Sequence, residues 1–191
     1  MEEVLKTFED LATTLALSGI TLLGIDETVT SCPPDAASQT TACGPWDGRV
    51  DEVVEFDSPD PLQAVDEAWW RLACQFDLFG AEGEFLLLVN LHDDPYDSDS
   101  YWARVRLQEK WTVAGSNSST INGPSLDGLI TMSPTGTVII EGSTYQDYMS
   151  VLAVPSPHRA SAIRKFTEFM LREHKLSADE AESVARWLAQ D

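Results

Sequence analysis

The sequence predicts one α+β domain over residues 1–191. It consists of a mainly antiparallel sheet of about six strands, an N-terminal helix, one internal helix and two C-terminal helices. Three observations lead to this prediction. Of the 191 residues, 43% are apolar, which is enough to bury a core. Apolar residues recur at helical spacing near both ends of the chain and once internally. The segments between show short apolar or alternating runs separated by turn residues, which is typical of strands.

The N-terminal part predicts one helix and two strands around a long loop. Residues 3–17 place apolar side chains every three or four positions, which predicts an amphipathic helix that Gly19 ends. The apolar run 20–25 and the valine-rich run 49–56 predict strands. Between them, residues 26–47 are poor in hydrophobic residues. They predict a long loop that is either mobile or functional.

An internal helix has the clearest boundary signals in the chain. Asp60 can cap it, Pro61 suits its first turn, and Gln63 can reach back to the cap. The apolar stripe that follows contains Trp69. We therefore expect Trp69 to pack in the core rather than to line a ligand site.

The rest of the chain predicts a strand meander and two closing helices. Apolar or alternating runs predict strands at 84–91, 101–113, 126–132, 137–141 and 148–154. The first closing helix is expected to begin at Ser156 and Pro157. The second is expected to begin at the capping box formed by Ser177 and Glu180.

Negative charge is concentrated in the first hundred residues. The chain has 32 acidic residues and 12 Lys and Arg, a formal net charge of −20. Residues 1–100 hold 22 of the acids and only three of these bases. Self-repulsion of this size destabilises a compact chain, so we expect it to serve a function. A solubility or high-salt adaptation is the alternative, although it would spread the acids over both halves. Binding to nucleic acid or to an anionic membrane needs a basic patch, and we expect neither.

The segment 92–102 predicts the main contact surface. Carboxylates steer a basic partner towards a surface, and aromatic rings supply rigid contact area. The residues expected to bind are Asp93, Asp94, Tyr96, Asp97, Asp99, Tyr101 and Trp102. A second contact set is expected around the strand 49–56: Asp47, Asp51, Glu52, Glu55 and Asp57. A solvated turn is the alternative interpretation of the segment 92–102, which lacks most ligands of a calcium loop.

Basic residues and histidines of the second half favour structural roles. Arginines in the strand 101–113 are expected to pair across the sheet with acids such as Glu52 or Glu141. His158 falls in the first turn of the expected closing helix, and His174 falls near the end of that helix. We expect both imidazoles to be structural.

The cysteines give no recognised site. Cys74 occupies an apolar helical position and is expected to be buried. Cys32 and Cys43 flank a polar loop, and a disulfide between them would require Cα atoms within about 7 Å. Cytosolic thiols usually stay reduced, so we expect both thiols to be free, and a disulfide between them is the alternative. The three cysteines and three histidines show no zinc spacing, and no metal or cofactor is expected.

These features favour a binding protein over an enzyme. A nucleophile elbow, a phosphate loop, a dinucleotide fingerprint and a zinc-protease helix are all missing from the sequence. We predict an acidic protein-binding module that neutralises a basic partner. An immunity protein (antitoxin) that occludes the active cleft of a bacterial toxin is the favoured case. A nucleic-acid mimic that inhibits a DNA-binding protein and an acidic secretion chaperone are the alternatives.

A cytoplasmic location is expected for this module. The start, Met1-Glu2-Glu3, is acidic where a secretory signal is basic. No run of about 18 uncharged apolar residues is present, so the sequence predicts no membrane span. The sequence does not indicate an oligomeric state.

Overall fold

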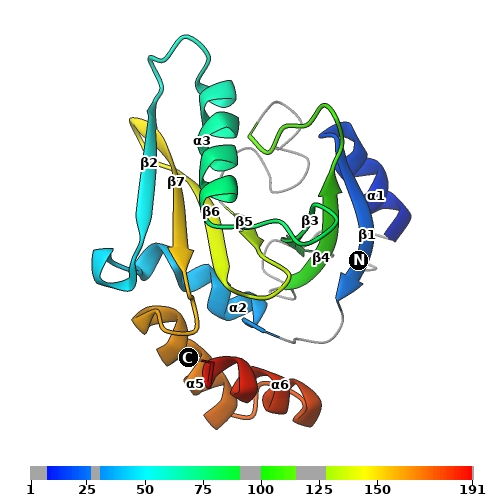
Figure 1. The fold of residues 1–191 in the computed structure, drawn as a ribbon, viewed down its shortest axis with the longest axis vertical. Coiled ribbons are helices and arrows are strands. Elements are labelled where there is room, and N and C mark those ends of the chain that lie inside the picture. The colour runs from blue at the N-terminus through cyan, green and yellow to red at the C-terminus, as the bar shows by residue number, and fades with distance from the viewer. Residues whose placement is uncertain (1–7, 27–30, 91–99, 115–127, 191) are drawn as a thin grey trace, which may run out of the picture.

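The computed structural model describes residues 8–26, 31–90, 100–114 and 128–190, and it confirms the α+β fold. One antiparallel sheet of seven strands, rather than about six, has the order β1-β4-β3-β5-β6-β7-β2 (Figure 1). The strands are β1 (Ile20–Asp26), β2 (Val50–Glu55), β3 (Glu84–Asn90), β4 (Ser100–Leu107), β5 (Leu129–Met132), β6 (Val138–Thr144) and β7 (Tyr148–Pro155). The edges of the sheet are therefore β1 and β2.

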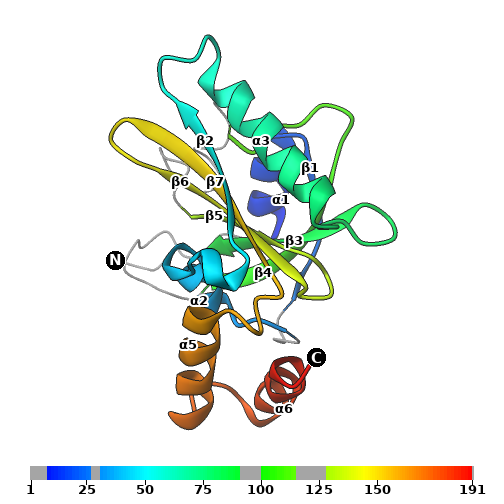
Figure 2. The same ribbon diagram turned by 60° about the vertical axis from the view of Figure 1, so that its left-hand side comes forward.

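Helices cover both faces of the sheet (Figures 1 and 2). One buried cluster joins the sheet to α1 (Phe8–Leu17) and α3 (Pro61–Gln75). The other face packs against α2 (Pro34–Ala37), the 3₁₀ turn η1 (Ser38–Ala42), α5 (Ser161–Arg172) and α6 (Ala178–Leu188). This double burial explains why β3 is a continuous apolar run. In the part of the chain that the structure describes, no helix has the length and apolar character needed to cross a bilayer.

Trp69 anchors α3 to the sheet, as the apolar stripe predicts. Its side chain is fully buried, and its indole N–H donates to Thr131 Oγ1 at 3.2 Å. The helix begins as expected, because Asp60 Oδ1 accepts from the Gln63 N–H at 3.1 Å. The Gln63 amide, however, donates to Glu67 instead of returning to the cap. The predicted cap is therefore half formed.

The segment predicted as a long loop is folded over its described part. Residues 31–47 contain α2, η1 and a second 3₁₀ turn, η2 (Pro45–Asp47). The side chains of Cys32, Ala36, Ala37 and Cys43 are buried against β-sheet residues and α5. Helical turns of three to five residues are too short to show a 3.6-residue period, so the pattern reads as loop. Residues 27–30 lie outside the described residues.

The strand predicted over 101–113 ends early, at Leu107. The chain then crosses the end of α1, where the Gln108 N–H donates to Gly19 O and the Thr112 N–H donates to Ser18 O. Gly19 has φ +69°, and a Cβ there would lie 1.8 Å from Lys110 O. Only glycine fits this crossing. Gly19 therefore ends α1, as predicted, and also admits the second chain.

The first C-terminal helix begins later than predicted, at Ser161. Ser156 has φ +51°, so the chain turns at the residue expected to be the cap. The first N–H of α5 finds its acceptor on a distant residue, because Ser161 donates to Asp47 Oδ1 at 2.9 Å. The start of α6 agrees with the prediction. There Ser177 and Glu180 form a complete capping box.

His158 is a buried imidazole before α5, rather than in its first turn. It is 5% exposed, and its ring meets that of Trp187 edge-on at 6.0 Å. Neither ring nitrogen has a hydrogen-bond partner among the described residues. Burial, followed by the charges of Arg159 and Arg164, lowers the pKa of His158 below its usual value. Both effects favour the neutral form of this imidazole in the folded chain.

We expect Trp69→Ala to lower the free energy of unfolding by about 3–5 kcal/mol, because it leaves a cavity and removes the donor to Thr131. Trp70→Ala is the matched control. Its ring is 42% exposed, and a loss of about 1–2 kcal/mol from its aromatic contacts is expected. Urea unfolding monitored by circular dichroism measures the free energy of unfolding of both variants. Equal losses of unfolding free energy in the two variants would contradict the anchoring role of Trp69.

We expect stability to fall on acidification between about pH 7 and pH 5, in part because of His158. The unfolded chain takes up a proton at this imidazole near its ordinary pKa, whereas the folded chain does so only at lower pH. Unfolding therefore binds a proton in this range, so stability is lost as the pH falls. His158→Phe should flatten that part of the profile, measured as urea midpoints against pH. His174→Asn changes an exposed histidine and should not flatten it.

Candidate functional site

The primary predicted contact set is described only at its C-terminal end. Asp93, Asp94, Tyr96, Asp97 and Asp99 lie outside the described residues. Trp102 is 3% exposed, and its indole N–H donates to Cys32 O at 2.8 Å. The strand period turns this ring towards the segment that precedes α2, so Trp102 is a core residue and not an exposed contact. Tyr101 is half-buried.

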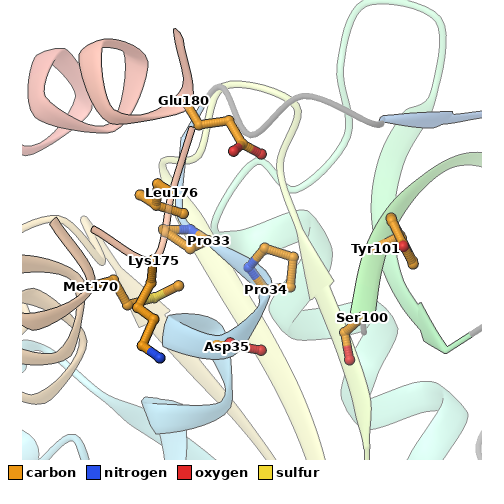
Figure 3. A pocket seen from close by; sticks show the side chains of 9 residues that line it. All are labelled: Pro33, Pro34, Asp35, Ser100, Tyr101, Met170, Lys175, Leu176 and Glu180. Carbon is orange, nitrogen blue, oxygen red and sulfur yellow. The ribbon is translucent and has the colours of Figure 1, made fainter. Parts of the chain in front are cut away.

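Tyr101 lines a small pocket where β4 meets three helical segments (Figure 3). The pocket has a volume of about 240 Å³ and is lined by Pro33, Pro34, Asp35, Ser100, Tyr101, Met170, Lys175, Leu176 and Glu180. Polar atoms make up more of its lining surface than apolar ones, and Lys175 is the one base in the lining. The Glu180 carboxylate already accepts from Ser177 N–H at 2.9 Å to cap α6. One of the two carboxylates in the lining is therefore already used to begin a helix.

The secondary predicted set lies along β2 and the turns on either side of it. Asp47 ties η2 to α5, since it accepts from Gly44 N–H and from Ser161 N–H, both at 2.9 Å. Burial alone would raise the pKa of Asp47. The hydrogen bonds from Ser161 and Gly44 outweigh burial, so this pKa lies below its ordinary value. Asp47 therefore has a structural role in addition to any contact with a partner.

Two further acids of the secondary set form ion pairs within the chain. Arg49 Nε bonds both carboxylate oxygens of Asp51, at 3.0 and 2.9 Å. Glu52 faces α3 and pairs with Arg71 at 2.5 Å. Exposed pairs of this kind contribute little to stability, but they neutralise charge locally. Glu55 and Asp57, by contrast, have no base within ion-pair distance among the described residues.

The pairing predicted for the β4 arginines occurs with other acids. Arg106 pairs with Glu82 at 2.9 Å and with Glu84 at 3.0 Å, and Arg104 lies 3.8 Å from Glu84. The register explains this partner, because Glu84 on β3 stands opposite Arg106 on β4. The expected partner Glu141 is instead a buried residue of β6.

We define the β2–α3 edge as residues 46–70, which run from η2 through β2 into α3 (Figure 1). It contains eight acids and a single base, Arg49; the acids are Asp47, Asp51, Glu52, Glu55, Asp57, Asp60, Asp66 and Glu67. Five of the nine exposed large apolar side chains of the described residues also lie here: Trp46, Val53, Phe56, Leu62 and Trp70. Acids on an edge strand help to prevent strand-to-strand aggregation. Exposed tryptophans have no such protective role, and they favour a contact surface.

The α3 residues of this edge were not predicted from the sequence as contact residues. Trp70 follows Trp69 directly and therefore falls off the buried stripe, which leaves its ring 42% exposed. The available signal was a large aromatic residue one position away from a core residue on an otherwise polar helix face. What the sequence could not show is that the Trp70 ring packs against that of Trp111 in a tilted arrangement, with ring centroids 5.6 Å apart.

Asp66 holds Trp111 beside α3. Its Oδ1 accepts from Val113 N–H at 2.8 Å and from Ala114 N–H at 2.9 Å. Burial raises the pKa of Asp66, and hydrogen bonds from the Thr112 side chain and these two amides oppose the rise. The carboxylate thus fixes the segment that follows Trp111 against the helix.

The cysteines and acidic groups provide no metal centre among the residues described. Cys32, Cys43 and Cys74 are free thiols, and Cys74 is exposed rather than buried as predicted. Burial raises the pKa of Cys32, and it raises that of Cys43 to about 11. Within the described ranges, no three His, Cys, Asp or Glu side chains are grouped to hold a metal ion.

Comparisons with known protein families, with curated proteins and with solved structures find no match for this chain. The residues and the geometry of the β2–α3 edge are therefore the observations that bear on function.

Asp66→Ala should lower the free energy of unfolding by about 1–3 kcal/mol, because it leaves two buried amides without an acceptor. It should also loosen Trp111, which would change the indole N–H resonance of that residue. Glu55→Ala, an exposed change on β2 that lies outside the surroundings of Trp111, is the control and should do neither. Urea unfolding and a ¹H–¹⁵N spectrum provide the two measurements. An unchanged Trp111 signal in Asp66→Ala would contradict this role.

Proposed function

We propose that this chain is an acidic protein-binding module that neutralises a basic partner. The observation that carries the proposal is the β2–α3 edge, which combines eight carboxylates, of which Glu55 and Asp57 have no basic partner among the described residues, with exposed aromatic and aliphatic side chains. Interfaces commonly pair aromatic anchors with a polar rim, and the charge steers the encounter.

The finer proposal is that the partner is a bacterial toxin enzyme and that this chain acts as its immunity protein in the cytoplasm. Enzymes that act on nucleic acids or nucleotides have basic clefts. A carboxylate-rich edge with protruding rings can occupy such a cleft in place of phosphate. A nucleic-acid mimic would use the same electrostatics but needs long rows of carboxylates. Here the described acids of the edge are divided among a strand, a turn and the start of a helix.

The proposal predicts that the position of the charge matters, and not only its amount. Glu55→Lys with Asp57→Lys reverses two unpaired acids of the edge. It should slow association with the basic partner by about tenfold at low salt, and high salt should reduce the difference. The partner is first captured from cells that naturally carry this chain. Association rates are then measured with the purified proteins.

The matched control is Glu173→Lys with Glu182→Lys, which changes the net charge equally just after α5 and on α6. These helices lie at the opposite end of the molecule from the turn between β2 and α3 (Figures 1 and 2). The control should slow association by less than about threefold. Equal slowing by both variants, or a captured partner without excess basic residues, would contradict the proposal. A captured DNA-binding regulator would favour the nucleic-acid mimic instead of the toxin inhibitor.

A further inference from the structure

A second pocket opens on the β2–α3 edge, beside the first half of α3. It has a volume of about 380 Å³ and is lined by Gln63, Asp66, Glu67, Trp70 and Trp111. Sites for small ligands have volumes of several hundred Å³ and usually combine apolar walls with a few polar groups. This one combines two indole rings with two carboxylates. Its chemistry is therefore that of a receptor for an organic cation.

The aromatic walls of this pocket are held in place from behind. The Trp70 ring lies 5.6 Å from that of Trp111 and 5.2 Å from that of Phe79. Trp111 also contacts the buried Trp69, at 5.5 Å between ring centroids. The Asp66 carboxylate holds the backbone just after Trp111. Because the walls are already ordered, a ligand need not bear the entropic cost of fixing them.

The charge of the pocket is negative and is only weakly countered by the nearest base, Arg71. Glu67 accepts a hydrogen bond from the neutral Gln63 amide at 3.0 Å and makes no ion pair with any residue described. The neighbouring base, Arg71, forms its ion pair with Glu52 instead. The Glu67 charge reaches Arg71 only as a weaker influence on its pKa, after Glu52. A cation from outside the chain would thus find a carboxylate beside two indole faces.

We propose that this pocket receives an arginine side chain of the basic partner. The guanidinium plane would lie against the indole of Trp70 or Trp111 and donate hydrogen bonds to the Glu67 carboxylate. Arginine fits better than lysine because its flat, weakly hydrated head stacks on aromatic rings and donates in a planar fork. This inference depends on the proposed function, since the arginine belongs to the partner that the β2–α3 edge binds.

Packing between the aromatic rings does not explain why Trp70 is exposed beside two carboxylates. A ring that served only the core would be covered, as Trp69 is, whereas Trp70 is 42% exposed at the mouth of the pocket. An apolar ligand would leave the Glu67 carboxylate with only the neutral Gln63 amide as a partner as it displaced water. A cationic side chain satisfies both the ring faces and the charge. Charge complementarity therefore selects the occupant.

The test uses a short peptide with one arginine, added to the full chain and followed by the indole N–H resonances of Trp70 and Trp111. The same peptide with citrulline is the control, because citrulline has nearly the same shape and no charge. We expect the arginine peptide to shift both resonances with saturation. A third peptide, with lysine in place of arginine, should bind several-fold more weakly. The citrulline peptide should shift neither resonance. Equal shifts from arginine and citrulline, or shifts that do not saturate, would overturn the proposal.

Variants separate the pocket from the general negative charge of the chain. Glu67→Gln is an exposed change that should not affect folding. It is expected to weaken binding of the arginine peptide by about fivefold to tenfold. Glu55→Gln removes the same charge outside the pocket lining and should change binding by less than about twofold. Trp70→Ala should abolish saturable binding. Equal weakening by Glu67→Gln and Glu55→Gln would reduce the effect to unspecific attraction and overturn the proposal.

Failure of this inference is distinguishable from failure of the proposed function. If the arginine peptide does not bind but reversal of Glu55 and Asp57 still slows association with a captured basic protein, the pocket is wrong and the function stands. If the arginine peptide binds with the expected variant pattern but no basic protein is captured, the pocket is a cation site and the proposed function is wrong.

Discussion

Burial of the sheet on both faces is the constraint on which the rest of this molecule depends. The central strands are covered by α1 and α3 on one side and by α2, α5 and α6 on the other. Unpaired charge is costly in such an interior, so most of the 32 acids must lie on edges, turns and outer helix faces. The edge strand β2 and the helix that follows it receive a large share. The concentration of negative charge is thus partly a consequence of the architecture.

Regular elements could be predicted from the sequence because their periods are long enough to detect. Trp69 on α3 and the capping box at Ser177 are examples, and the structure agrees with both. Short helical turns such as η1 have no detectable period. The start of α5 was predicted wrongly, because Ser156 followed by proline resembles a helix cap. The acceptor for the first N–H of α5 is instead Asp47, over a hundred residues away in the chain. Local patterns do not reveal acceptors of this kind.

In the candidate site, too, some features could be predicted from the sequence and others depend on tertiary packing. Charge along 47–57 is visible in the sequence, and those acids do line one edge of the sheet. The meeting of Trp70 with Trp111 is a tertiary contact, set by the packing of α3 and by the Asp66 carboxylate. Trp102 shows the opposite error. An aromatic residue beside an acidic turn suggested a surface anchor, but the alternation of β4 turns it into the core.

The ties made by Asp47, Asp51 and Glu52 have a consequence for electrostatic models of this chain. Each of these carboxylates is already held by an amide or an arginine, so its field is partly cancelled at the surface. A ligand approaching from solvent meets fewer effective anions than a tally of side chains suggests. The net charge of the chain already counts Arg49 and Arg71, so these contacts leave the total unchanged and alter only where along the edge the negative charge is felt.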